Sequence, residues 1–100
     1  MSTIITTLGS TIRTDLVFAD QGNPVDLTGA DLSIGETNRT ALAAATLTVV
    51  DPPAGVFRLF LAHAKAGELP LGKVSWFRVV ARRPGRECPV VTPKIWVTVV

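Results

Sequence analysis

The sequence predicts an all-β domain, and three observations support this prediction. The 100 residues are 47% hydrophobic and 18% charged, which is typical of a compact folded chain and not of a disordered one. Apolar and polar residues alternate in short runs, the pattern of half-buried strands. Clusters of Gly and Pro separate these runs at intervals of roughly 8–12 residues, as in β-sandwiches and barrels. At this length we expect one domain, residues 1–100, with a single core.

The first two strands are expected before residue 20. The alternation is clearest from Thr11 to Ala19, where one side of the predicted strand carries Ile12, Thr14, Leu16 and Phe18. The preceding stretch, Ile4–Leu8, is rich in Thr and Ile. Because β-branched residues suit a pleated surface, we predict a short edge strand there.

Two more strands are expected before the middle of the chain. Asp31–Thr37 alternates through Leu32 and Ile34 and leads into a polar loop. The alanine-rich stretch Ala41–Ala45 has high helix propensity, but five residues are too few to nucleate a helix. We therefore predict a strand from about Ala44 to Val50.

The second half is expected to begin with a hairpin. Its turn is Asp51–Gly55, in which two prolines fix φ and a glycine permits a positive φ. The returning strand is Val56–Leu61. One or two helical turns are predicted in Ala62–Leu69, where Gly67 and the following proline end the helix.

A second hairpin completes the pattern. It joins a long strand, Lys73–Arg83, to a last strand running from Glu87 to Val99, in which Pro89 and Pro93 predict an edge position. The total is seven strands with almost no helix. This organisation predicts an antiparallel β-sandwich of immunoglobulin-like type, without the Cys-Trp-Cys signature of antibody domains.

Catalytic chemistry is not indicated by the residue pattern. His63 is the single histidine, and its neighbours in sequence are alanines that provide no orienting carboxylate. We expect a surface histidine. Cys88 is the single cysteine and precedes Pro89, so we expect a small buried hydrophobic residue there and not a nucleophile. The chain is predicted not to be an enzyme.

Metals, cofactors, nucleic acids and membranes are likewise not indicated. The aspartates form no D-x-D-x-D loop, one Cys and one His are too few for a zinc site, and no glycine-rich phosphate loop occurs. A net charge of +2 without a basic run is a weak footprint for nucleic acid. The start of the chain lacks a signal-peptide pattern, and no apolar run approaches the roughly 18 residues of a membrane span. We expect synthesis in a reducing cytoplasm.

The residues on the outward faces of the predicted strands indicate a binding surface. If Phe57, Phe77 and Ile95 point into the core, aromatic and basic side chains alternate with them and point outward. Such mixtures are enriched at binding surfaces. The candidate interface residues are Phe60, Trp76, Arg78, Arg82, Lys94 and Trp96.

Two alternatives remain open for this surface. In one, Trp76 and Trp96 face inward and fill the core. In the other they face outward and need a partner, because exposed apolar patches commonly mark interaction sites. The outward arrangement predicts a homo-oligomer or several copies in an assembly, and the Thr-rich N-terminal segment could pair with an open sheet edge of a neighbour.

Four stretches of the chain carry a resemblance to a known family. They are D-L-V-F at residues 15–18, N-P-V-D-L-T-G-A at residues 23–30, V-D-P-P-A-G-V-F at residues 50–57, and G-K-V-S-W-F at residues 72–77. In this order the chain resembles, over roughly residues 11–99, the immunoglobulin-like N-terminal domain of phage baseplate upper proteins and related small tailed-phage structural proteins. Val74 stands where that family often has tyrosine.

The resemblance implies a non-enzymatic virion structural protein, made in the host cytoplasm. Decoration protein, collar, adaptor and tail or baseplate component are the roles it suggests, with capsid, portal, collar or tail proteins as partners. It supplies no catalytic residues. The alternative from another class is a carbohydrate-binding or adhesin-like β-sandwich module, in which Trp76 and Trp96 with Arg78 form a stacking platform.

Overall fold

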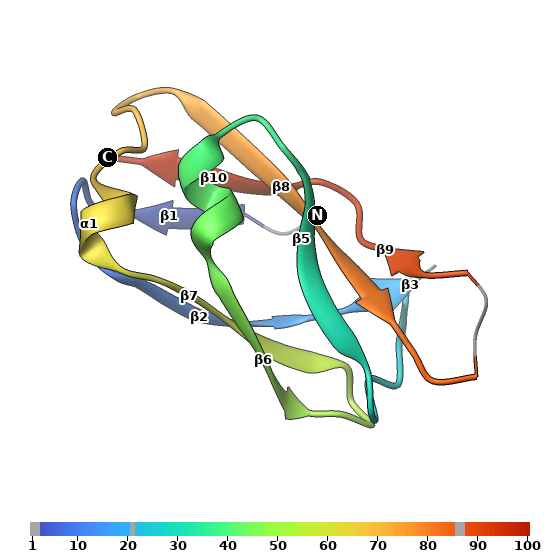
Figure 1. Cartoon of the computed structure of the whole chain (residues 1–100). Helices are drawn as coiled ribbons and strands as arrows, with labels where there is room; N and C mark the ends of the chain where they lie inside the picture. The colour runs from blue at the N-terminus through green and yellow to red at the C-terminus, as the bar shows by residue number, and fades with distance from the viewer. Residues whose placement is uncertain (1–2, 21, 86–87) are drawn as a thin grey trace.

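The computed structural model describes residues 3–20, 22–85 and 88–100. Within these ranges it contains ten strands, one 3₁₀ helix and one α-helix of a single turn (Figure 1). In chain order the elements are β1 (Thr3–Thr6), β2 (Ile12–Val17), β3 (Ala19–Asp20), β4 (Asn23–Pro24), β5 (Asp31–Thr37), η1 (Thr40–Ala44), β6 (Thr46–Asp51), β7 (Val56–Leu61), α1 (His63–Ala66), β8 (Val74–Arg82), β9 (Val90–Val91) and β10 (Ile95–Val99). The regular structure is mostly β, which confirms the all-β part of the predicted fold class.

The larger sheet has five strands and is built around β8. Its order is β1-β10-β8-β5, and β9 also pairs with β8. β8 runs antiparallel to β10 and to β5, which confirms that the last two long strands pair, whereas β1 joins parallel to β10. Along β8 every second residue from Ser75 to Ala81 is buried, and the residues between them are half-buried. One face of this sheet therefore covers the core.

The smaller sheet has three strands in the order β2-β7-β6, and β7 is antiparallel to both neighbours. The predicted turn between β6 and β7 is present and depends on Gly55, which has a φ of 73°. A Cβ at this position would lie 2.8 Å from the carbonyl oxygens of Phe18 and Val25. Only glycine fits here without strain, because the left-handed backbone and the close approach both exclude a side chain.

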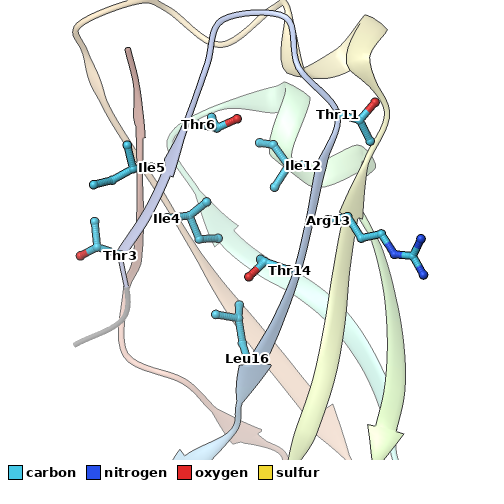
Figure 2. Close-up of a pocket in the computed structure, with 9 residues that line it drawn as sticks. All are labelled: Thr3, Ile4, Ile5, Thr6, Thr11, Ile12, Arg13, Thr14 and Leu16. Carbon is cyan, nitrogen blue, oxygen red and sulfur yellow. The ribbon is translucent and has the colours of Figure 1, made fainter.

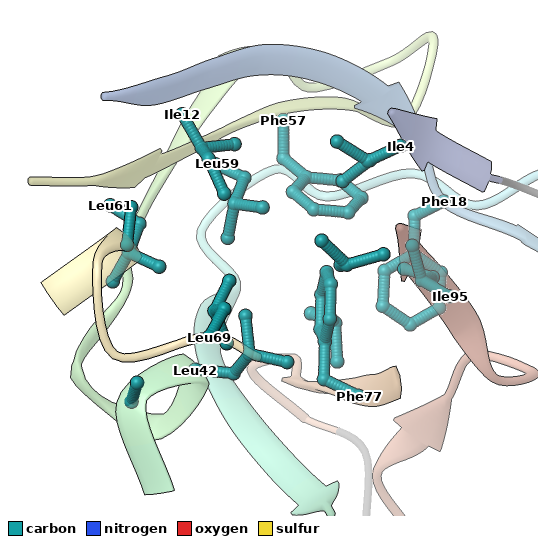
Figure 3. Packing of buried hydrophobic residues seen from close by; sticks show 14 of the residues in the cluster. Ile4, Ile12, Phe18, Leu42, Phe57, Leu59, Leu61, Leu69, Phe77 and Ile95 are labelled. Carbon is teal, nitrogen blue, oxygen red and sulfur yellow. The ribbon is translucent and has the colours of Figure 1, made fainter. Parts of the chain in front are cut away.

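The two sheets face each other across one apolar core (Figure 3). Phe57 from the smaller sheet and Phe77 from the larger sheet are fully buried, together with Phe18, which packs edge-on against Phe57 with 6.2 Å between the ring centroids. Leu42 and Leu69 close the end of the core beside η1 and α1. Each fully buried side chain of this size stabilises the fold by about 1.5–3 kcal/mol relative to an exposed one.

The predicted edge position of the last strand is wrong. The segment expected to be one strand contains β9 and β10, with Pro93 in the gap between them, and its predicted first residue, Glu87, lies outside the described residues. β10 is an inner strand, since β1 lies on one side of it and β8 on the other. Pro93 therefore removes no hydrogen bond from the ladder of β10, and it marks the gap between two strands instead of a sheet edge.

Two other boundaries differ from the prediction. The strand expected over residues 11–19 ends at Val17, because Phe18 turns into the core: its N–H donates to the carbonyl of Gly55 (2.7 Å) and its carbonyl accepts from Val25 N–H (2.8 Å). Residues 40–44 form a 3₁₀ helix, so the prediction of no helix in Ala41–Ala45 is wrong, and the strand expected from about Ala44 begins at Thr46. Ala41 and Leu42 are buried, so tertiary packing stabilises a helix too short to form alone.

Candidate functional site

Trp76 and Trp96 lie on the outer face of the five-stranded sheet. They are directly opposite each other in the antiparallel pairing of β8 and β10. Both are half-buried, whereas their neighbours along the strands are buried, among them Phe77 and Ile95. The alternation of the two strands thus places both indoles outside the core, and the alternative in which they fill the core does not hold.

The ammonium group of Lys94 lies close to both indole rings. Its Nζ lies 4.3 Å from the centroid of the Trp76 ring and 5.7 Å from that of Trp96. Both distances are within the roughly 6 Å at which a cation is attracted by the negative face of an aromatic ring. We refer to Trp76, Lys94 and Trp96 as the indole–lysine cluster.

Asn38 fixes the backbone beneath this cluster. Asn38 directly follows the last residue of β5, Thr37, and its side chain extends the pairing with β8 beyond the end of the strand. Its Oδ1 accepts from Trp76 N–H (2.8 Å), and its Nδ2 donates to the carbonyl of Val74 (3.2 Å). Sequence reasoning missed this residue, because its position in a polar loop gives no sign that it contacts a strand more than thirty residues away.

Two basic candidates lie on the same strand as Trp76 but differ in their surroundings. Arg78 is the next outward residue of β8 and is half-buried, and its Nε is buried without a hydrogen-bond partner among the described residues. Arg82 is exposed and lies opposite Asp31. Since Arg82 is six residues beyond Trp76, the two are separated by about 20 Å along the strand.

Phe60 is separated from the other candidates. It lies on β7 in the three-stranded sheet, where it is 42% exposed and pairs with Arg13 of β2. The structure therefore brings Trp76, Lys94 and Trp96 into contact and places Arg78 beside them, but it does not bring Phe60 or Arg82 to the same place.

Exposed apolar side chains continue the surface of the cluster. Ile5 is 71% exposed and Val74 is 54% exposed. Both lie opposite Thr98 in the register of the sheet, one strand to each side, in the row next to the tryptophans. We refer to Ile5, Val74, Arg78 and the indole–lysine cluster as the outer patch. It combines apolar surface with positive charge, which is a common composition of protein-binding surfaces.

The remaining chemistry-bearing residues are dispersed. His63 is exposed at the start of α1, as expected. Cys88 is exposed, so the prediction of a buried cysteine is wrong: it lies in a loop before β9 and not inside a strand.

Over residues 3–20, 22–85 and 88–100, no three His, Cys, Asp or Glu side chains come together to hold a metal ion. No helix in the same ranges is long and apolar enough to cross a membrane.

A groove of about 340 Å³ lies between β1 and β2 (Figure 2). Ile4 and Thr6 of β1 point toward Ile12, Thr14 and Leu16 of β2 across it. β1 pairs with β10 and β2 pairs with β7, but the two strands do not pair with each other. The Thr-rich N-terminal strand, which was expected at an edge and as a strand for a neighbour, lies at the edge of its own sheet.

The groove lies at the edge of the fold and the outer patch on the outer face of a sheet, and the two adjoin at Ile5 of β1. No protein-family model and no curated protein matches the chain.

Proposed function

We propose that this chain is a non-enzymatic structural protein of a tailed-phage virion that docks on larger virion proteins through its outer patch. The observation that carries the proposal is the outward pair Trp76 and Trp96 with Lys94 between them. Large aromatic side chains at a surface stabilise a complex when a partner covers them, and Trp and Arg are enriched among the residues that dominate binding energy.

An immunoglobulin-like β-sandwich is the fold we infer for this role. In immunoglobulin domains, strands B, E and D share one sheet and strands C, F and G the other. The orders β2-β7-β6 and β10-β8-β5 support this assignment, since they correspond to B-E-D and G-F-C. The first strand differs from the constant-type arrangement, because β1 lies beside β10 and not beside β2.

Most of the family-like stretches support the fold and not a binding site; the exception is residues 72–77, which contain Val74 and Trp76 of the outer patch. Within N-P-V-D-L-T-G-A, Val25 and Leu27 are buried, and the carboxylate of Asp26 accepts from Thr28 N–H (2.9 Å) and Thr28 Oγ1 (2.6 Å). These contacts make a turn and anchor it to the core. Docking therefore depends on the outer patch, whose residues lie mainly outside those stretches.

The outer patch also indicates the chemistry of the partner. Lys94 and Arg78 are cationic and half-buried on this face. A partner that offers apolar side chains for the indoles and carboxylates for these two cations would match this composition. Capsid, portal, collar and tail proteins are the proposed partners, with several copies of this chain in each particle.

Carbohydrate binding is the weaker candidate. A sugar stacks on the free face of an aromatic ring, and the Lys94 ammonium lies over the ring of Trp76 at 4.3 Å. A sugar would have to displace it from a favourable contact. A protein partner can instead contact the indole edges and the lysine together.

The test is the composition of intact phage particles. Particles released from cells that carry the gene are purified and digested, and the protein is quantified against the major capsid protein by mass spectrometry. We expect several copies per particle. We expect Trp76→Ala/Trp96→Ala to lower the incorporated amount about tenfold or more, since truncating central tryptophans removes a large share of docking energy.

Phe60→Ala is the matched control, because this aromatic side chain is exposed on the other sheet. It should be incorporated like the unaltered protein. Absence of the protein from particles overturns the proposal. Glycan-array binding that is lost in Trp76→Ala, with no incorporation into particles, would establish the carbohydrate-binding alternative instead.

A further inference from the structure

Five strands of the two sheets have an open edge: β1, β5 and β9 in the larger sheet, and β2 and β6 in the smaller. Natural proteins prevent uncontrolled pairing at such edges by keeping them short, by interrupting them with bulges or prolines, or by placing charged side chains on them. β1 has four residues, β9 has two, and the registers of β5 and β6 are irregular. Every one of these edge strands except β2 is therefore protected by length or by an irregularity.

β2 is neither short nor irregular, and its two charged residues, Arg13 and Asp15, are of opposite sign. All six of its residues, Ile12–Val17, pair with β7 in an unbroken register, and the strand contains no proline, lysine or glycine. Its other edge borders the groove, and Thr14 and Leu16 are half-buried there. A regular edge beside an open groove can accept another strand.

The sequence of β2 is complementary to itself when two copies run antiparallel. With Thr14 on the two-fold axis, Thr14 meets Thr14 of the second copy, and Arg13 meets Asp15. Ile12 meets Leu16 on the groove side. Each of these cross-strand pairs is of a favourable type: two threonines, opposite charges and two aliphatic side chains. The two-fold symmetry makes every pair occur twice except the one on the axis.

Charge selects this register over its neighbours. A slip that preserves which residues face the groove moves the axis to Arg13 or to Asp15. The first alternative places two arginines opposite each other, and the second places two aspartates opposite each other. Like charges directly opposite are unfavourable, so only the register centred on Thr14 has unlike charges in contact.

Asp15 is already held in position for this contact. Its carboxylate accepts from Nε of Arg58 (2.8 Å) and from Nη2 of Arg58 (3.3 Å) on the neighbouring strand β7. The side chain of Arg13 is exposed and makes no ion pair within the described part of the chain. A second copy would therefore place Asp15 between Arg58 and the arginine of its partner.

We propose that two copies of this chain form a symmetric dimer by pairing their β2 strands, so that the two three-stranded sheets become one continuous sheet. The occupant of the β2 edge is thus a second copy, selected by the Arg13–Asp15 charge pattern. This inference does not depend on the proposed function, because the outer patch lies on the other sheet and only its Ile5 lines the groove beside β2.

The first test is a charge exchange measured by sedimentation velocity over a wide concentration range. Arg13→Glu places a second carboxylate opposite Asp15, and we expect it to weaken self-association about tenfold. Asp15→Lys places an ammonium group opposite Arg13, and we expect it to weaken self-association as well. Mixed together, the two variants should form a heterodimer, since both of their cross-strand pairs then have opposite charges. Lys73→Glu, the same charge change in an exposed turn, should leave association unchanged.

The second test fixes the register and does not require Asp15→Lys to fold. In a Cys88→Ser background, Thr14→Cys should form an intermolecular disulfide under mild oxidation, because the two copies of residue 14 are neighbours across the axis. Val17→Cys should not form one. Its two copies are offset by six residues, or about 20 Å, although the side chain of Val17 is exposed.

A chain that sediments as a monomer at every concentration overturns the dimer and leaves virion docking standing. A dimer that is unaffected by Arg13→Glu, or that cross-links through Val17→Cys and not through Thr14→Cys, overturns the β2 interface. Heterodimers formed only by the mixed charge variants, together with cross-linking at residue 14, establish it.

Discussion

The ammonium group of Lys94 lies 4.3 Å from the centroid of the Trp76 indole, on the outer face of the five-stranded sheet. Two strands contribute to this contact: Trp76 is on β8, and Lys94 immediately precedes β10. Because Trp96 lies opposite Trp76 in the pairing of these strands, the lysine lies near both indoles. Lys94, at the end of the loop between β9 and β10, thus contacts both tryptophans and helps to hold that loop against the sheet.

Lys94→Met is expected to lower the free energy of unfolding by about 0.5–1 kcal/mol, the usual contribution of a cation over an exposed aromatic ring. The methionine keeps most of the aliphatic contact and removes the charge. Urea unfolding followed by tryptophan fluorescence measures the change. Lys73→Met, an exposed lysine in a turn, should alter stability by less than about 0.5 kcal/mol. Equal losses in the two variants would contradict a cation–π contribution.

Gly55→Ala is expected to be one of the most damaging single-methyl additions in the chain. The backbone there has a φ of 73°, and the new Cβ would approach two carbonyl oxygens to 2.8 Å. Gly72→Ala is a matched control with a φ of 71° and no atom within 4 Å of the new Cβ. Gly72→Ala should cost about 1 kcal/mol from backbone strain. Gly55→Ala should cost about 1–3 kcal/mol more, because the close approach forces the backbone to shift.

Thermal and urea unfolding of both glycine variants provide the comparison. Similar losses for the two would show that the hairpin turn can move away from Phe18 and Val25 at little cost. That result would contradict the role of the turn in holding the segment between β2 and β5 against the core.

Alternation predicts the outer patch well because it is a local property. Once Phe77 and Ile95 point inward, Trp76 and Trp96 must point outward, and the hairpin-like pairing of β8 and β10 places them opposite each other. The turn at Asp51–Gly55 is equally local, since its prolines and glycine restrict the backbone by themselves.

The features that the sequence does not reveal depend on contacts between distant segments. Residues 40–44 become helical because Leu42 is buried against the rest of the fold. β10 becomes an inner strand because the first strand of the chain lies parallel to it. Asn38 supports Trp76 by extending the pairing of β5 with β8 past the end of β5. None of these contacts leaves a periodic pattern in the sequence near the residues involved.

Cys88 shows a different reason for a wrong prediction. The expectation of a buried thiol assumed that residues 87–99 form one strand, whereas β9 begins at Val90. A cysteine outside the strand has no core to enter, and Cys88 is exposed. A wrong strand boundary thus changed the predicted environment of the side chain.

Thr92→Val is expected to destabilise the chain by about 1–3 kcal/mol, although the two side chains have similar shapes. Thr92 is 4% exposed, and its Oγ1 accepts a hydrogen bond from Val79 N–H at 2.9 Å. The valine would leave that buried donor without a partner, which costs its desolvation energy. Urea unfolding measures the loss. Thr48→Val, at an exposed position of β6, should change stability by less than about 0.5 kcal/mol.

Thr92→Ser separates the hydrogen bond from the packing of the methyl group. It keeps the hydroxyl and should retain most of the stability that Thr92→Val loses. If serine is as damaging as valine, the methyl group contributes as much to stability at this position as the hydrogen bond from Val79 N–H.

The ion pair of Asp15 with Arg58 should make the free energy of unfolding depend on pH in the acidic range. The hydrogen bond from Arg58, and then the charge of the same guanidinium with a smaller effect of Arg13, holds the pKa of Asp15 below its ordinary value of 3.8. A carboxylate whose pKa is lower in the folded state contributes stability above its unfolded pKa, and this contribution is lost as the pH falls through the folded pKa. Asp15→Asn removes the stabilisation by the Asp15 carboxylate at neutral pH. In strong acid this carboxylate is protonated in the unaltered chain as well, so the substitution should have little effect there.

The difference in urea midpoint between the unaltered chain and Asp15→Asn should therefore be constant from about pH 7 to pH 5 and shrink below the ordinary pKa. The same difference measured in an Arg58→Met background should be much smaller at neutral pH, because the main cause of the lowered pKa is gone. A difference that grows as the pH falls would have the wrong sign for a carboxylate stabilised by a neighbouring cation. A difference that persists unchanged in the Arg58→Met background would mean that Asp15 acts through some contact other than Arg58.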